Sequence, residues 1–295
     1  METQVEGSGA WEADETAEPH GESAEDADGR ESFAEHLALA EGRDRPDGPG
    51  TSEPTPTLEE RVMAFRRQSL DRESTLREEM KQVVVAAGGI PGSEQERPET
   101  DQDTRTGRER LEDWHRVHLV GLEHATKSAD SLRDKFSRYE AAGMSGADIV
   151  ARIKDALRYT IQLPDDQYSA GAWKAIEALT AQGHELLEVR NFWEDKVYRG
   201  VNTSWRDHAS ELNFEVQFHT PIGFLAKQAT HPIYKVQREL DPTKEQDREK
   251  MSELQNKQAV FTHFVAVPPG AETIVGPRDR EQRDAQGQDQ QEGTS

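Results

Sequence analysis

The sequence contains no cysteine and no long hydrophobic run. The lack of thiols excludes disulfide bonds, thiolate nucleophiles and cysteine-ligated metals. The first residues carry neither the basic nor the apolar stretch of a secretory signal. No segment approaches the roughly 18 apolar residues that a transmembrane helix needs. We therefore expect a cytoplasmic protein, with export by a route that needs no cleavable signal as the alternative.

Hydrophobic residues are also scarce, at 33% of 295 residues, and the mean hydropathy is −0.93. A chain this polar cannot bury a core along its entire length, so part of it should be disordered. Basic residues number 36 against 58 acidic ones, and the net charge of −22 repels nucleic acid and anionic lipid. We therefore expect neither nucleic acid nor a membrane as a partner.

Composition divides the chain into three parts. Residues 1–105 are rich in acidic residues, Gly, Ser and Pro, and they are predicted to be mostly disordered, with a helix over 58–85 lying outside the core. The acidic N-terminal tail is a candidate for binding another protein, and a solvated tail without a partner is the alternative. Residues 106–275 form the predicted folded domain, and 276–295 form a second disordered tail. Because every motif lies after residue 126, residues 1–100 should be dispensable for catalysis.

One strand is predicted over residues 211–220, because apolar and polar residues alternate strictly there. Its polar face carries Glu215, Gln217 and His219, spaced roughly 6 to 7 Å apart in steps. Such a row suits a metal or phosphate site, and an ordinary solvent-exposed face is the alternative.

A second strand is predicted over 155–163, with Asp155 and Arg158 near its start. Periodicity and turn residues predict two further strands and five principal helices in the folded domain. The strands are 186–192 and 201–205, and the helices are 110–123, one that Ser128 caps, 168–182, 221–240 and 243–258. The expected fold class is α+β, a mixed sheet of four to five strands flanked by helices, with disordered N- and C-terminal tails.

The helix that Ser128 caps carries residues that suit a polyphosphate. Ser131 and Lys135 are four residues apart and share one face, with Lys127 one turn earlier. Cations and a hydroxyl near a helix start are typical phosphate ligands. A solvated basic helix face is the alternative reading of these residues alone.

Five motifs occur in the order found in one enzyme family. They are Lys127-(x3)-Ser131-(x3)-Lys135, Asp155-(x2)-Arg158, Tyr198-x-Gly200-x-Asn202, Glu215-x-Gln217-x-His219-Thr220 and His231-(x2)-Tyr234-Lys235. On these motifs, residues 107–270 resemble the synthetase domain of the RelA/SpoT alarmone synthetases, which has a nucleotidyltransferase-like fold. The segments Leu-Arg-Tyr-Thr, Tyr-Arg-Gly-Val-Asn and Gln-Phe-His-Thr are most similar to the branch that contains the actinobacterial nucleotide 3′-pyrophosphokinases and related toxin domains.

The resemblance implies transfer of pyrophosphate from ATP to the 3′-OH of a purine nucleotide, with Mg²⁺ as the cofactor. It assigns metal binding and catalysis to Asp155 and Glu215, and Glu215 would also help to deprotonate the acceptor hydroxyl. Two carboxylates are hard oxygen ligands of the kind that Mg²⁺ prefers. The implied ATP contacts are Lys127, Ser131, Lys135, Arg158 and His219. The implied acceptor contacts are Tyr198, Asn202 and Gln217.

Departures from the usual family sequence at Gly200, Asn202 and His219 follow the pyrophosphokinase branch. They leave adenine and guanine acceptors both open, so the product would be a (p)ppApp- or a (p)ppGpp-type alarmone. A role as a toxin or effector would imply an immunity or antitoxin protein as a partner. The alternative function is a catalytically inactive nucleotide-binding or structural domain of a phage or toxin system. A metal-dependent phosphohydrolase is disfavoured because the chain has no His-Asp dipeptide.

Overall fold

The structure is a computed structural model that describes residues 56–90 and 115–276. The predicted disorder over most of residues 1–105, the expected domain start at residue 106 and the C-terminal tail lie outside the described residues. The division of the chain into these parts therefore stays a prediction.

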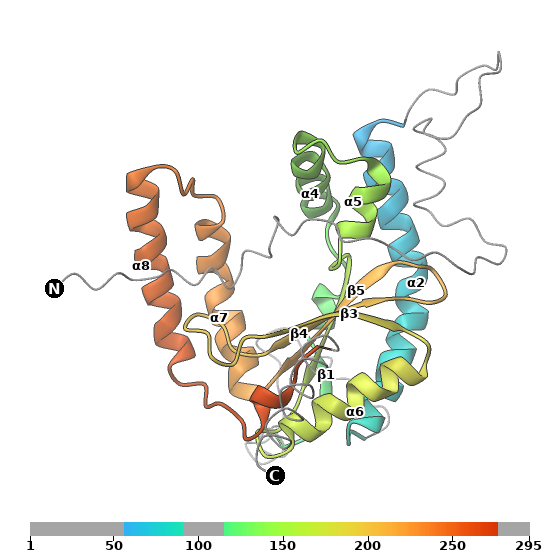
Figure 1. The fold of residues 1–295 in the computed structure, drawn as a ribbon, viewed down its shortest axis with the longest axis vertical. Helices are drawn as coiled ribbons and strands as arrows, with labels where there is room; N and C mark the ends of the chain where they lie inside the picture. Colours follow the sequence, from blue (N-terminus) through green and yellow to red (C-terminus); the bar gives the residue numbers. More distant parts are fainter. Residues whose placement is uncertain (1–55, 91–114, 277–295) are drawn as a thin grey trace, which may run out of the picture.

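A five-stranded mixed sheet forms the centre of the described chain, in the order β1-β2-β5-β4-β3 (Figure 1). Its strands are β1 (His118–Val120), β2 (Leu157–Gln162), β3 (Glu185–Asn191), β4 (Val201–Arg206) and β5 (Asn213–His219). The central pair β2 and β5 is parallel, and the other neighbours are antiparallel. With helices on the sheet, the fold class is α+β, as the sequence predicts.

The register between β2 and β5 gives the sheet one apolar and one polar face. Partners in a parallel pair lie side by side and point to the same face. The apolar pairs are Leu157 with Phe214, Tyr159 with Val216 and Ile161 with Phe218. The polar pairs are Arg158 with Glu215, Thr160 with Gln217 and Gln162 with His219. The alternation predicted for 211–220 therefore places its polar row directly beside the polar row of β2.

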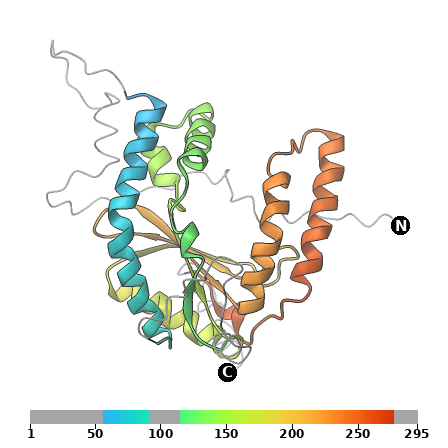
Figure 2. The same ribbon diagram turned by 180° about the vertical axis from the view of Figure 1, so that it is seen from behind.

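Helices cover the two faces differently (Figures 1 and 2). Their bounds are α2 (Leu58–Ala86), α4 (Ala129–Ala141), α5 (Gly146–Arg152), α6 (Tyr168–Ala181), α7 (Pro221–Gln237) and α8 (Glu245–Thr262). Helices α2 and α6 contribute to the main core on the apolar face, α4 and α5 pack beside the first half of α2, and α7 with α8 forms an antiparallel hairpin on the other side of the molecule. None of these helices combines the length and hydropathy needed to cross a lipid bilayer.

Helix α2 confirms the helix predicted over 58–85, but its expected place outside the core is wrong. A capping box between Thr57 and Glu60 starts it. Its second half contributes to the main core, and its first half contributes to a smaller cluster with α4 and α5. The buried face passes through Ser69 while Leu70 is exposed, so a polar residue interrupts the apolar stripe that would have indicated burial.

The prediction of a helix over 110–123 is wrong for residues 115–123, the part of this segment that the structure describes. Residues 118–120 form the edge strand β1, antiparallel to β2, and a short 3-10 helix, η1 (Leu122–His124), follows. All three residues of β1 are buried. Pairing with β2 supplies backbone hydrogen bonds that local periodicity does not reveal, and this pairing prevails over the helical spacing.

Candidate active site

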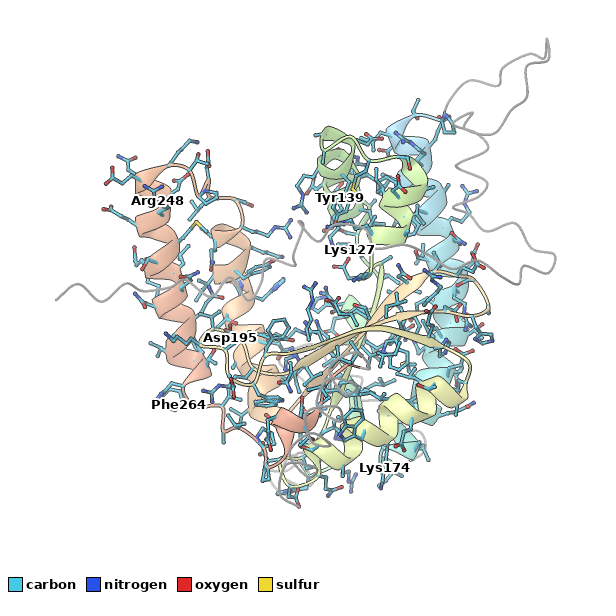
Figure 3. The ribbon with its side chains drawn as sticks, viewed as in Figure 1. Lys127, Tyr139, Lys174, Asp195, Arg248 and Phe264 are labelled. Atoms are coloured by element: carbon cyan, nitrogen blue, oxygen red, sulfur yellow. The ribbon has the colours of Figure 1, made fainter. Side chains whose placement is uncertain are left out.

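Five charged side chains meet at the polar face of the sheet, close to the start of α4. Figure 3 labels one of them, Lys127, between α4 and the sheet. We call them the Asp155 cluster: Lys127, Lys135, Asp155, Arg158 and Glu215. Four of the five motifs found in the sequence contribute to this region or lie next to it. The structure therefore brings together residues that are up to 88 positions apart, from Lys127 to Glu215.

Backbone hydrogen bonds position Lys127 beside Asp155. The Lys127 amide donates to the Ala156 carbonyl at 3.0 Å, and the Arg158 amide donates to the Ala125 carbonyl at 2.8 Å. The segment before α4 thus runs along the start of β2 like a short additional strand. Ser128 ends this segment and caps α4 by accepting from the Ser131 amide, as predicted.

Both oxygens of Asp155 are engaged by cations. Lys127 Nζ lies 2.5 Å from Oδ2, and Lys135 Nζ lies 2.9 Å from Oδ1. Arg158 then joins the two acids, since it donates to Asp155 Oδ2 at 3.0 Å and to Glu215 Oε1 at 2.7 Å. Strand alternation would put Asp155 and Arg158 on opposite faces, but Asp155 lies before the first residue of β2 and turns toward Arg158.

The cluster changes the ionisation of its members. Burial would raise the pKa of Asp155, but Lys135, Lys127 and Arg158 together outweigh it and hold this pKa well below its usual range. Burial lowers the pKa of Lys127 to about 8, with Asp155 opposing the shift and Lys135 adding to it. Burial would lower the pKa of Arg158, but Glu215 and Asp155 raise it. Asp155 and Arg158 are therefore charged at neutral pH.

Lys227 on α7 is a site residue that the sequence analysis missed. Its Nζ donates to Gln217 Oε1, and Gln217 Nε2 donates to Glu215 Oε1. Burial, followed by the charge of Arg158, lowers the pKa of Lys227 to about 7. Its Nζ also lies 5.5 Å from the centre of the Phe224 ring. A lysine three residues after an apolar residue, on the buried side of a largely apolar helix, was the signal available in the sequence.

Tyr198 and His219 form a buried layer beside the Asp155 cluster. The His219 Nδ1 lies 3.1 Å from the Arg199 carbonyl, and Nε2 lies 2.8 Å from the Tyr198 hydroxyl. Burial, with the charge of Lys227, lowers the pKa of His219 well below its ordinary value, so the ring is neutral. Because a carbonyl can only accept, Nδ1 carries the proton and Nε2 is an acceptor. The Tyr198 hydroxyl has one proton, and it faces two acceptors, His219 Nε2 and Asn202 Oδ1, to the second of which it donates at 2.7 Å.

Gly200, the glycine of the third motif, lies against the His219 ring, which leaves no room for a side chain. Gly200 has φ of +157°, and a Cβ there would lie 2.7 Å from the His219 ring. A side chain at position 200 would therefore collide with His219. Gly200 and His219 are thus compatible with each other.

The acceptor and phosphate roles predicted for the buried layer remain predictions. Tyr198 and Gln217 are each 3% exposed and His219 is 0% exposed, so these side chains are covered in this arrangement. Ser131 lies half-buried on the first turn of α4, near the cluster. The residues of the fifth motif, His231, Tyr234 and Lys235, follow Lys227 along α7.

The donor set of the cluster agrees in type with a Mg²⁺ site. Asp155 and Glu215 are joined through one guanidinium, and Mg²⁺ is commonly held by one or two carboxylates together with substrate phosphates and water. The cations that now contact these acids are the groups that a bound polyphosphate would attract.

Comparisons with known proteins give fold likenesses at low similarity. No family model and no curated protein matches the sequence. The small alarmone synthetase 1 from Bacillus subtilis matches with a TM-score of 0.40 and 13% identity, over 78% of this chain and 97% of that one. The same synthetase bound to its product pppGpp matches with a TM-score of 0.31 and 14% identity, over 53% and 85% of the chains. The protein smu.1046c from Streptococcus mutans UA159 matches with a TM-score of 0.35 and 12% identity, over 53% and 79%. At such identities and scores these likenesses establish no function.

Proposed function

We propose that this protein transfers pyrophosphate from ATP to the 3′-OH of a purine nucleotide. The observation that carries the proposal is the Asp155 cluster, in which Lys127, Lys135 and Arg158 surround two carboxylates at the edge of a polar sheet face. Phosphoryl-type transfer needs little covalent work from a protein, because positioning and charge neutralisation supply most of the catalysis.

The ATP triphosphate would bind where the cations exceed the acids. Lys127, Lys135, Arg158 and Lys227 are four basic groups against the two acids Asp155 and Glu215. An anion entering the cluster would replace the internal ion pairs with pairs to phosphate oxygens. Ser131, at the first turn of α4, would add a hydroxyl and lies near free helix amides.

Asp155 and Glu215 would hold Mg²⁺, which when bound would offset the charge of the β- and γ-phosphates. In the reaction, the acceptor 3′-oxygen bonds to the β-phosphorus of ATP, and the bond from that phosphorus to the oxygen bridging to the α-phosphate breaks. AMP leaves with that oxygen. Glu215 would take the proton of the 3′-hydroxyl, and Lys227 would adjust the charge around it through Gln217.

The acceptor would lie toward Tyr198, Asn202 and Gln217, on the side of the cluster that faces α7. The resemblance of the third and fourth motifs to those of the nucleotide 3′-pyrophosphokinases and toxin domains is the ground for proposing adenine nucleotides as acceptors alongside guanine nucleotides. A toxin or effector role, with an immunity protein as partner, would follow from the same similarity.

The test is incubation of the purified full chain with ATP, Mg²⁺ and each of AMP, ADP, ATP, GDP and GTP. Labelling ATP at the γ-phosphate and, separately, at the adenine follows both fragments. We expect one labelled pyrophosphorylated product per active acceptor and an equal amount of AMP. Release of ADP instead would indicate single phosphoryl transfer, and no transfer to any acceptor by protein that binds ATP would favour the inactive nucleotide-binding domain.

A further inference from the structure

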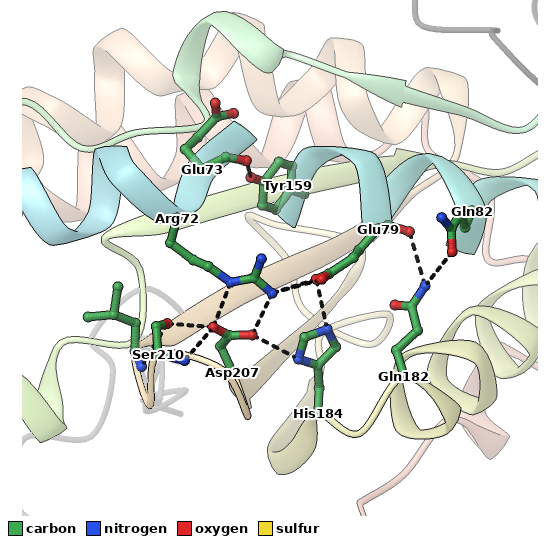
Figure 4. Close-up of polar contacts among 10 residues, drawn as sticks. Arg72, Glu73, Glu79, Gln82, Tyr159, Gln182, His184, Asp207 and Ser210 are labelled. Atoms are coloured by element: carbon green, nitrogen blue, oxygen red, sulfur yellow. Dashed lines mark hydrogen bonds and ion pairs between the residues drawn. The ribbon is translucent and has the colours of Figure 1, made fainter. Parts of the chain in front are cut away.

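A second polar cluster lies between α2 and the ends of two strands (Figure 4). It joins Arg72 and Glu79 of α2 to His184, which precedes β3, and to Asp207, which follows β4. The His184 ring lies 5.1 Å from that of Phe214, edge to face. Phe214 points to the apolar face of β5, so this cluster is separate from the candidate active site and takes no part in the proposed reaction.

We infer that His184, Asp207 and His208 form a binding site for a zinc-type transition metal ion. Among the described residues, these three place one ligand atom each within 4.8 Å of one another. Two imidazoles and a carboxylate are a typical zinc donor set, with a fourth position left for water. His208 is exposed, whereas His184 and Asp207 are buried, so an ion would enter from the side of His208.

His184 provides the second observation that points to an ion. Its side chain is fully buried, yet neither ring nitrogen makes a hydrogen bond of normal geometry within the described chain. Its Nδ1 lies 3.3 Å from Asp207 Oδ1. Two ligands of a tetrahedral zinc ion, each about 2.0 to 2.1 Å from the metal, are about 3.3 Å apart. The spacing is therefore long for a hydrogen bond and suitable for two ligands of one ion.

The surrounding groups match the supporting partners that metal ligands usually have. His184 Nε2 faces Glu79 Oε2 at 3.3 Å, so the nitrogen turned away from Asp207 can donate to a carboxylate. Arg72 donates to Asp207 Oδ2 at 2.7 Å and to Oδ1 at 2.9 Å, and it also binds Glu79. These contacts fix the orientation of both buried ligands.

The charge balance of the cluster also favours a cation. Apart from the histidines, the cluster contains two acids, Glu79 and Asp207, against the single guanidinium of Arg72. A buried region with net negative charge is stabilised by a further positive charge. The His208 ring packs over Gly183, where an added Cβ would lie 3.5 Å from it, at an ordinary van der Waals distance. The two imidazole centres are 5.4 Å apart.

The test is Zn²⁺ binding to untagged, metal-free full-length protein, followed by calorimetry and by metal analysis after dialysis. We expect one ion per chain and, at Zn²⁺ about a hundredfold above its Kd, a rise in Tm of roughly 5 to 10 °C. Co²⁺ should bind competitively and give the absorption spectrum of a tetrahedral site.

The variants separate a metal site from a merely structural cluster. His208→Ala, which changes an exposed residue, should lower the Zn²⁺ affinity by more than about a hundredfold, and Glu79→Gln should lower it by about 10- to 100-fold. His263→Ala at the end of α8 is the matched control and should bind like the wild type. Absence of Zn²⁺ binding, or equal affinity in the His208 and His263 variants, would overturn the inference and leave His184 as a buried structural side chain between two carboxylates.

Discussion

The two polar clusters on opposite sides of the sheet differ in the sign of their uncompensated charge. The Asp155 cluster, with Lys227, has more basic groups than acids. The cluster of Arg72, Glu79, His184 and Asp207, called the His184 cluster below, has more acids than permanent cations. An excess of positive charge favours an anion such as a polyphosphate, and an excess of negative charge favours a cation. Among buried groups, the charge that remains unpaired indicates the kind of ligand better than the pairs themselves do.

Single residues of the two clusters also differ in exposure. The Arg158 side chain is 33% exposed, whereas the His184 and Asp207 side chains are 0% and 1% exposed. A substrate that enters and leaves needs exposed side chains to bind to. A contact that holds α2 against the strands needs buried side chains, because its strength depends on exclusion of water.

The largest effect is expected from removing α2. This helix contributes Arg72 and Glu79 to the His184 cluster, whereas it affects the Asp155 cluster only through the core. A variant that begins at residue 104 should fail to fold, contrary to the expectation that residues 1–100 are dispensable. Each large apolar side chain buried by α2 contributes about 1.5 to 3 kcal/mol, and several together exceed a typical total stability of about 5 to 15 kcal/mol. A variant that begins at residue 56 should fold and transfer pyrophosphate. Circular dichroism and urea titration distinguish the two; a folded, active variant from residue 104 would show that α2 is not part of the core.

Glu215→Gln tests the Asp155 cluster as the proposed site of polyphosphate and Mg²⁺ binding. It keeps the shape of the side chain but removes the charge proposed to hold Mg²⁺, so kcat should fall by at least about a hundredfold. The variant should stay folded, with some loss of Tm because Arg158 loses one of its two carboxylate partners. Glu188→Gln is the matched control, because Glu188 pairs with Lys154 and Arg190 outside the Asp155 cluster. Turnover at the wild-type level in Glu215→Gln would remove Glu215 from the mechanism.

Asp207→Asn tests whether the buried ion pair between Arg72 and Asp207 stabilises the fold. Arg72 would lose a buried partner, and breaking such a pair costs about 3 to 5 kcal/mol in free energy of unfolding. Arg133→Ala removes an exposed ion pair with Glu59, and it should change the free energy of unfolding far less than Asp207→Asn does. Urea unfolding of both variants measures the difference. Equal losses would mean that burial does not distinguish these pairs.

The smallest expected effect is the pH dependence of ATP affinity. Lys127 has a folded-state pKa of about 8, below the ordinary value of 10.5, and bound phosphate favours its charged form. ATP affinity should therefore be full below pH 8 and fall by up to about tenfold per unit as the pH rises above 8. The contribution of Lys127 to the free energy of unfolding changes in the opposite direction. It rises between about pH 8 and pH 10.5, because in that range Lys127 binds more protons in the unfolded chain than in the folded one. Lys127→Arg, which stays charged, should flatten the binding profile. An unchanged profile in that variant would assign the titration to another group, such as Lys227.

Much of the fold could be predicted because its signals are local. Strict alternation located β5, turn residues and periodicity located α6 and α7, and Ser128 marked the start of α4. The edge strand β1 was missed because three residues carry too little pattern, and its hydrogen bonds come from β2, about forty positions away. The core position of α2 was missed because Ser69 interrupts its buried stripe.

The sequence by itself determined which residues could form the candidate site, because strand alternation and motif order depend on neighbouring residues. Only the tertiary structure decided that Arg158 lies beside Glu215, that Lys227 joins them from α7, and that His184 meets Asp207 and His208. Those contacts depend on the register of β2 with β5 and on how α2 and α7 pack. Register and packing are set by the free energy of the whole core, to which residues far apart in the chain contribute together, and no local pattern records that sum.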